Sequence, residues 1–133
     1  MPASAGAEDD EPVRTIQAGD GPAFRFELSK DGKTMVTGSF TVSVRASKVW
    51  DTTEWRLTGA IPLPGIFRAL SPDGKTLAFV SNDDGYLWLC DIGTGRSKRT
   101  EITGPWGPHS RRTNAVLFAA YSPDGKLLAT YVN

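Results

Sequence analysis

Few residues in this sequence could do chemistry, and their types limit the reactions that they could support. His109 is the only imidazole and Cys90 the only thiol, so Cys and His cannot supply a four-ligand zinc set, and no internal disulfide can form. A Ser–His or Cys–His catalytic pair would have to use His109, with Ser110 beside it, but the sequence has no Gly-x-Ser-x-Gly elbow. We therefore expect no catalytic residue, and we interpret Cys90 as a small buried apolar side chain.

Two short motifs mimic ligand-binding loops but lack a defining residue. Gly32-Lys33-Thr34 and Gly74-Lys75-Thr76 resemble the end of a phosphate-binding loop, but Glu27 and Ala69 stand where that loop needs an earlier glycine. Asn82-Asp83-Asp84-Gly85 lacks the distal glutamate of a calcium-binding loop and is typical of a tight turn. We expect neither a cofactor nor a metal ion.

Arg68 interrupts a position that is otherwise apolar. Its counterparts, three residues before the recurring serine described below, are Phe26 and Ala119. If Arg68 lies on the innermost strand of a repeat, it faces a central channel and can contact a ligand there. The alternative is packing against a carboxylate of a neighbouring repeat.

The segment 96–112 concentrates basic residues around one aromatic side chain, Trp106. Its basic residues are Arg96, Lys98, Arg99, Arg111 and Arg112, and Glu101 is its only acid. A basic loop with an exposed aromatic residue is typical of sites for acidic peptides or nucleic acids, although an ordinary long loop has the same composition. The candidate partner-binding residues are Arg68, Arg96, Arg99, Trp106, Arg111 and Arg112, and we expect a protein or peptide partner, not a nucleic acid.

The element that must position these residues is a hairpin corner that occurs three times. Ser29-Lys30-Asp31-Gly32-Lys33, Ser71-Pro72-Asp73-Gly74-Lys75 and Ser122-Pro123-Asp124-Gly125-Lys126 each lie between two apolar runs. Proline favours the first central position of a type I turn, and glycine adopts the left-handed conformation that lets the returning strand pair. The serines are 42 and 51 residues apart. Because a period in the forties is typical of propeller blades, the spacing predicts an all-β repeat protein.

The repeats divide the chain into units. We expect a disordered acidic arm at 1–12, containing Glu8, Asp9, Asp10 and Glu11, which could alternatively act as an acidic ligand. Residues 13–133 form propeller blades: a lone strand and loop at 13–22, blade 1 at 23–65, blade 2 at 66–114 and half of a third blade at 115–133. Each complete blade is predicted to be a four-stranded antiparallel sheet.

Composition excludes several classes of protein. Fifteen Lys and Arg residues balance fifteen Asp and Glu residues, so net charge predicts no attraction to polyanions or membranes. No apolar run of 18 residues and no basic-then-apolar amino terminus is visible, so the sequence predicts neither a transmembrane helix nor a secretion signal. The compartment stays open, with the cytoplasm favoured.

The repeated pattern resembles the WD-repeat β-propeller family over about residues 13–133. Trp50-Asp51 match the dipeptide of that family, Cys90-Asp91 occupy the same place in the second unit, and Pro108-His109 stands near the position of its Gly-His. The corner also occurs in translocation-protein-type and prolyl-oligopeptidase-type propellers. The resemblance implies structural roles for the repeated Asp and Gly residues of the corners, for the dipeptides and for the loop histidine, namely Asp31, Gly32, Trp50, Asp51, Asp73, Gly74, Asp91, His109, Asp124 and Gly125.

The resemblance implies a non-catalytic scaffold that binds a protein or peptide, and we expect a fragment of a longer propeller. A terminal blade with no neighbour exposes an apolar face, so further blades or self-association must cover it. The alternatives are the amino-terminal propeller portion of an enzyme, for example a peptidase-type substrate filter, and a propeller that binds a small molecule.

Overall fold

The computed structural model describes residues 15–16, 23–39, 46–63, 65–81, 83–103 and 116–132, and in these ranges the regular structure is entirely β. The strands are β1 (Ala23–Leu28), β2 (Thr34–Ser39), β3 (Ala46–Asp51), β4 (Arg56–Pro62), β5 (Gly65–Leu70), β6 (Thr76–Ser81), β7 (Tyr86–Asp91), β8 (Ser97–Thr103), β9 (Val116–Tyr121) and β10 (Leu128–Val132). Thr15 and Ile16 belong to no strand, and the rest of the strand expected at 13–17 lies outside the described residues.

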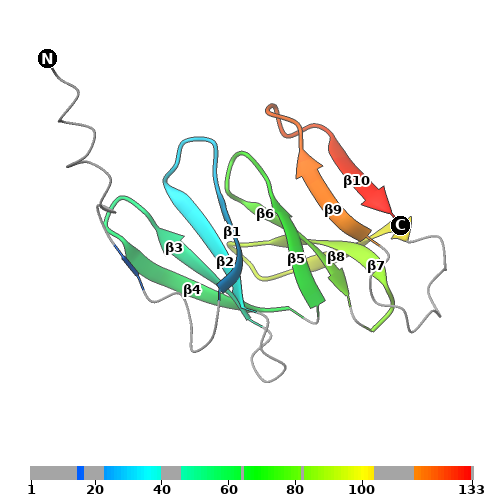
Figure 1. Ribbon diagram of the computed structural model, residues 1–133, viewed down its shortest axis with the longest axis horizontal. Helices are drawn as coiled ribbons and strands as arrows, with labels where there is room; N and C mark the ends of the chain where they lie inside the picture. The colour runs from blue at the N-terminus through cyan, green and yellow to red at the C-terminus, as the bar shows by residue number, and fades with distance from the viewer. Residues whose placement is uncertain are drawn as a thin grey trace, which may run out of the picture.

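The strands form three antiparallel sheets that follow one another along the chain (Figure 1). Two sheets have four strands, in the orders β1-β2-β3-β4 and β5-β6-β7-β8, and the third pairs β9 with β10. Every neighbour in a sheet is also a neighbour in sequence, so each sheet is an up-and-down meander built by hairpins. The prediction of four-stranded antiparallel blades with an incomplete last blade is confirmed.

Two apolar layers hold the three sheets together. The first sheet buries Val36, Val49 and Ile61 against a cluster on the second sheet that includes Leu77 and Phe79. The opposite face of the second sheet packs on the third sheet through a second set of apolar side chains, namely Ala69, Ala78, Val80, Leu87 and Ala119. Because its two faces are covered by two different neighbours, the second sheet carries four of the five largest fully buried side chains of the described residues, namely Phe79, Leu77, Leu87 and Cys90.

The first strand of the second sheet contacts both neighbouring sheets. β5 packs against β9 on one side and against β1 and β2 on the other. Arg68 therefore lies on the edge strand of the second sheet that contacts both neighbouring sheets.

The equivalence of the two complete sheets extends to single residues. Trp50 pairs with Met35 across β2 and β3, and Cys90 pairs with Leu77 at the same place across β6 and β7. Cys90 is fully buried, as expected for a small apolar side chain. The tryptophan and the cysteine of the two dipeptides thus occupy one structural position.

Candidate functional site

Each corner is closed by the same small hydrogen-bond network. In the second corner the Ser71 hydroxyl donates to Oδ1 of Asp73 at 2.6 Å, and this oxygen also accepts the Lys75 N–H at 3.0 Å. The Ser71 oxygen in turn accepts the N–H of Thr76 at 2.9 Å. The other two corners repeat these bonds with distances of 2.5–3.0 Å, from Ser29 and Asp31 to Lys33 and Thr34, and from Ser122 and Asp124 to Lys126 and Leu127.

The corner glycines adopt the left-handed conformation that the turn requires. Gly32, Gly74 and Gly125 have φ of 71°, 73° and 74°, a region that costs a residue with a Cβ about 1–2 kcal/mol. The predicted turn chemistry is therefore confirmed at all three corners. It also explains Gly32-Lys33-Thr34 and Gly74-Lys75-Thr76 as strand-to-strand turns, in which the lysine N–H is directed to an aspartate of the same corner.

The hydrogen bonds stabilise the ionised form of the corner aspartates. The serine hydroxyl, followed by the lysine N–H, lowers the pKa of Asp31, Asp73 and Asp124 below the usual 3.8. Asp51 and Asp91 also have lowered pKa values, caused first by the hydroxyl of Thr53 and by the N–H of Thr94, respectively. These carboxylates are anchors of turns, which gives them the structural role implied by the repeat.

The corners of neighbouring sheets touch. The N–H of Lys30 donates to the carbonyl of Pro72 at 2.8 Å. A Cβ added to Gly74 would lie 3.1 Å from the Cβ of Ser29, and one added to Gly125 would lie 3.6 Å from Cδ of Pro72. The three corners therefore form one continuous surface at one end of the sheets, and their tips point the same way in Figure 1.

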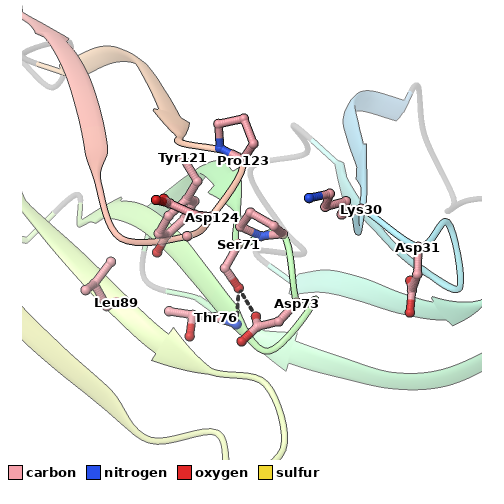
Figure 2. Close-up of a pocket in the computed structure, with 11 residues that line it drawn as sticks. Lys30, Asp31, Ser71, Asp73, Thr76, Leu89, Tyr121, Pro123 and Asp124 are labelled. Atoms are coloured by element: carbon pink, nitrogen blue, oxygen red, sulfur yellow. Dashed lines mark hydrogen bonds between the residues drawn. The ribbon is translucent and has the colours of Figure 1, made fainter.

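A pocket of about 780 Å³ opens on this surface, which we call the corner pocket (Figure 2). It is lined by Lys30, Asp31, Ser71, Pro72, Asp73, Thr76, Leu89, Tyr121, Pro123, Asp124 and Gly125. The two proline rings, Leu89 and the ring of Tyr121 supply apolar surface, and the corner aspartates supply a polar rim. No described group of His, Cys, Asp and Glu side chains is arranged to hold a metal ion.

Tyr121 places a polar atom in this apolar surrounding. Its hydroxyl is buried and makes no hydrogen bond with the described residues. Burial, followed by the negative charge of Asp73, raises the pKa of Tyr121 above its usual 10.0. Tyr121 does not stand out in the sequence because the corners that surround it are far apart in the chain. Only its position directly before the third corner signalled a role.

The candidate basic residues do not form one site in the described structure. Arg68 is buried on β5, whereas Arg96 and Arg99 are exposed at the start of β8, and β6 and β7 separate the two strands. Arg99 stacks over the ring of Tyr86, with its Cζ 4.5 Å from the ring centroid. Trp106, His109, Arg111 and Arg112 lie outside the described residues.

Two tryptophan side chains donate hydrogen bonds within their own sheets. The indole N–H of Trp50 donates to the Thr37 hydroxyl at 3.0 Å, and that of Trp88 donates to the carboxylate of Asp84 at 3.2 Å. Asp84 also accepts the N–H of Tyr86, and Gly85 has a φ of 73°. The 82–85 segment is thus a turn over its described residues, as the sequence predicts.

Comparison with known proteins agrees with this architecture. No protein-family model and no curated protein matches the sequence. Hydrazine synthase from Kuenenia stuttgartiensis is similar in structure, with a TM-score of 0.59 and 21% identity over 92% of this chain and 32% of the other. TolB from Acinetobacter baumannii gives a TM-score of 0.56 and 25% identity over 80% of this chain and 26% of its own.

The fold is a partial β-propeller. It consists of two four-stranded blades and one hairpin of a third within the described residues. The chain spans about a third of the hydrazine synthase chain and about a quarter of the TolB chain. No described helix is long and apolar enough to cross a membrane.

Proposed function

We propose that this chain is a non-catalytic scaffold that binds a protein or peptide, built from WD-repeat-like blades and belonging to a longer propeller. The observation that carries the proposal is the corner pocket, which three successive blades build together. Binding pockets are typically concave and mostly apolar, with a few polar groups that fix orientation. The corner pocket combines Leu89, two proline rings and a tyrosine with a rim of aspartates.

The rigidity of the corners favours binding. Each rim aspartate is held by its own serine and by a backbone N–H, so a ligand does not have to pay for ordering these side chains. Tyr121 lines the pocket, while its hydroxyl is buried behind this surface. A peptide that packs on Tyr121 and Leu89 would gain apolar contact.

Two observations support a longer propeller. The two solved structures described above are about three times as long as this chain. The outer faces of the first and third sheets also carry large exposed apolar side chains, which are Phe26 and Leu28 on one and Phe118 and Tyr131 on the other. Neighbouring blades would remove this surface from water.

The proposal is tested by selecting peptides from a displayed library on the immobilised chain and measuring their affinity by calorimetry. We expect Tyr121→Ala and Leu89→Ala to weaken the selected peptides at least tenfold, because each removes a wall of the pocket. Tyr131→Ala is the matched control, since Tyr131 lies on the same hairpin but on its exposed outer face.

Selected peptides that bind both pocket variants with unchanged affinity would contradict the proposal, provided that thermal unfolding shows the variants to be folded. A hydrolytic or redox turnover of the purified chain that disappears in His109→Ala would instead favour an enzyme.

A further inference from the structure

The first and third sheets each have an apolar face that no described sheet covers, and the two faces match the two sides of the contacts inside the chain. We call the face of a sheet toward the following sheet its front face, the face toward the preceding sheet its rear face, and the contact between two sheets a joint. We propose that the front face of the third sheet binds the rear face of the first sheet of a second copy of this chain. The inference goes beyond the corner pocket and does not depend on it.

The rear side of each joint inside the chain is built from one pair of positions. These positions lie one residue before and six residues after the corner serine, and they pair across the hairpin as Leu70 with Leu77 and as Tyr121 with Leu128. Leu70 and Leu77 are buried in the apolar cluster shared with the first sheet. Tyr121 and Leu128 pack against the cluster shared with the second sheet. The rear side of both joints therefore consists of two large side chains.

The front side of each joint uses the neighbouring pair of positions, two residues before and seven residues after the corner serine. In the second sheet these are Ala69 and Ala78, which pair with each other and are buried against the third sheet. In the first sheet they are Glu27 and Val36. Val36 is buried in the cluster with the second sheet, and Glu27 accepts the N–H of Leu70 at 2.6 Å. The large rear pair of one sheet thus packs on the front pair of the sheet before it.

The third sheet repeats the front face of the second sheet without a described partner. Its residues at the two front positions are Ala120 and Ala129, the same residue types as in the second sheet, and they pair with each other and are exposed. Phe118 and Tyr131, the next pair on this face, are also exposed. The third sheet therefore presents an apolar front face with two small residues where the second sheet accepts a large pair.

The first sheet presents the matching rear face. Leu28 and Met35 occupy the two rear positions and pair across the hairpin, as the rear pairs of the other sheets do. Leu28 is 51% exposed, and Phe26, which lies further along the same face and pairs with Thr37, is 66% exposed. A front face with two alanines can accept this leucine and methionine in the way that the second sheet accepts the third.

The two uncovered faces lie at opposite ends of the molecule (Figure 1), so a contact between them joins two copies. In this contact Ala120 and Ala129 of one copy pack against Leu28 and Met35 of the next, which removes apolar surface from water. The contact is heterologous, because the two copies use different faces. Each copy keeps one free face of the other kind, so the assembly grows from head to tail.

The test is a complementation experiment with two variants that each have one blocked face, followed by sedimentation velocity. Leu28→Glu blocks the rear face of the first sheet, and Ala120→Glu blocks the front face of the third. We expect the unchanged chain to form species larger than a dimer at high concentration. Each variant alone should associate about tenfold more weakly, because its contact buries an unpaired carboxylate. An equimolar mixture should form a 1:1 dimer and no larger species, since one intact front face then meets one intact rear face.

The matched control is Lys98→Glu, which introduces the same side chain on the exposed outer strand β8. It should associate as the unchanged chain does, and an equal loss in this control would overturn the proposal. Thermal unfolding shows which variants are folded. If Leu28→Glu or Ala120→Glu does not fold, Phe26→Glu replaces it on the rear face or Phe118→Glu on the front face, since both residues are more than half exposed.

The outcomes identify which faces meet. If folded Leu28→Glu associates as strongly as the unchanged chain, front faces pair with each other, and if folded Ala120→Glu does so, rear faces pair with each other; either result overturns the proposal. A mixture of folded variants that stays monomeric also overturns it. An unchanged chain that is monomeric at every concentration does the same and assigns the faces to further blades of a longer propeller. Peptide affinity at the corner pocket should be equal in the two variants, which separates this contact from the proposed function.

Discussion

The corner serines are the residues on which the turns depend most. The hydroxyl of Ser71 is both a donor to Asp73 and an acceptor from Thr76, and the residue is buried. Replacing a side chain that makes two such bonds leaves a backbone N–H without its acceptor, which is costlier than losing an exposed bond.

We expect Ser71→Ala to lower the free energy of unfolding by about 1–3 kcal/mol. Urea denaturation followed by tryptophan fluorescence measures this loss. Ser97→Ala, at the exposed start of β8, should change the midpoint little. Equal effects of the two substitutions would contradict the role of the corner hydroxyl.

The corner aspartates predict a dependence of stability on pH. Their pKa values are lowered from 3.8 in the folded chain, so the unfolded chain binds more protons between the folded pKa and 3.8. Their contribution is therefore fully present above about pH 4–5 and is lost as the pH falls through the folded values. The urea midpoint should fall between pH 5 and pH 2.5, and Asp73→Asn should flatten this fall. Glu101→Gln serves as the control, and a fall that Asp73→Asn leaves unchanged would exclude the corner as its source.

At the scale of elements, the contact between the first two blades depends on the absence of a side chain at Gly38 in β2. Gly38 faces the ring of Phe67, and its substitution forces a Cβ to within 2.8 Å of that ring. Gly59 of the same sheet has no atom within 4 Å of an added Cβ, so the two glycines form a matched pair.

We expect Gly38→Ala to destabilise the chain by about 1–3 kcal/mol through overpacking, and Gly59→Ala to change its stability little. Thermal unfolding of both variants measures the difference. If Tm fell equally in both variants, the loss of stability would arise within the strands and not at the contact between the blades.

The sequence predicted the elements because the corner is local: Ser, Asp, Gly and Lys within five residues determine the turn, and the flanking apolar runs determine the strands. It predicted less of the candidate sites. The bulge at Arg68 depends on pairing with β6, which single-strand alternation does not reveal.

At the scale of the whole molecule, the two end faces of the fold carry apolar side chains that no neighbouring sheet covers within the described residues. Phe118 and Tyr131 are 61% and 58% exposed and lie side by side, with ring centroids 6.4 Å apart. Large exposed apolar side chains grouped on a sheet face mark an interaction surface.

We expect the isolated chain to self-associate as its concentration rises, which light scattering coupled to gel filtration measures as a rising molar mass. Phe118→Ser combined with Tyr131→Ser should reduce the association. Trp55→Asn removes an exposed aromatic side chain from the turn between β3 and β4, where φ is 54°, and should not reduce it. A monomer at all concentrations would show that these faces do not drive assembly.

The hydrogen bond from Lys30 to Pro72 has a consequence for engineering such arrays. A designer who averaged the three corners would write proline at position 30, as at Pro72 and Pro123, since proline suits the turn itself. Proline has no amide hydrogen to donate, so this change would improve a turn and remove a hydrogen bond between two modules. A residue that departs from the consensus of the turn thus contributes to the contact between one module and the next.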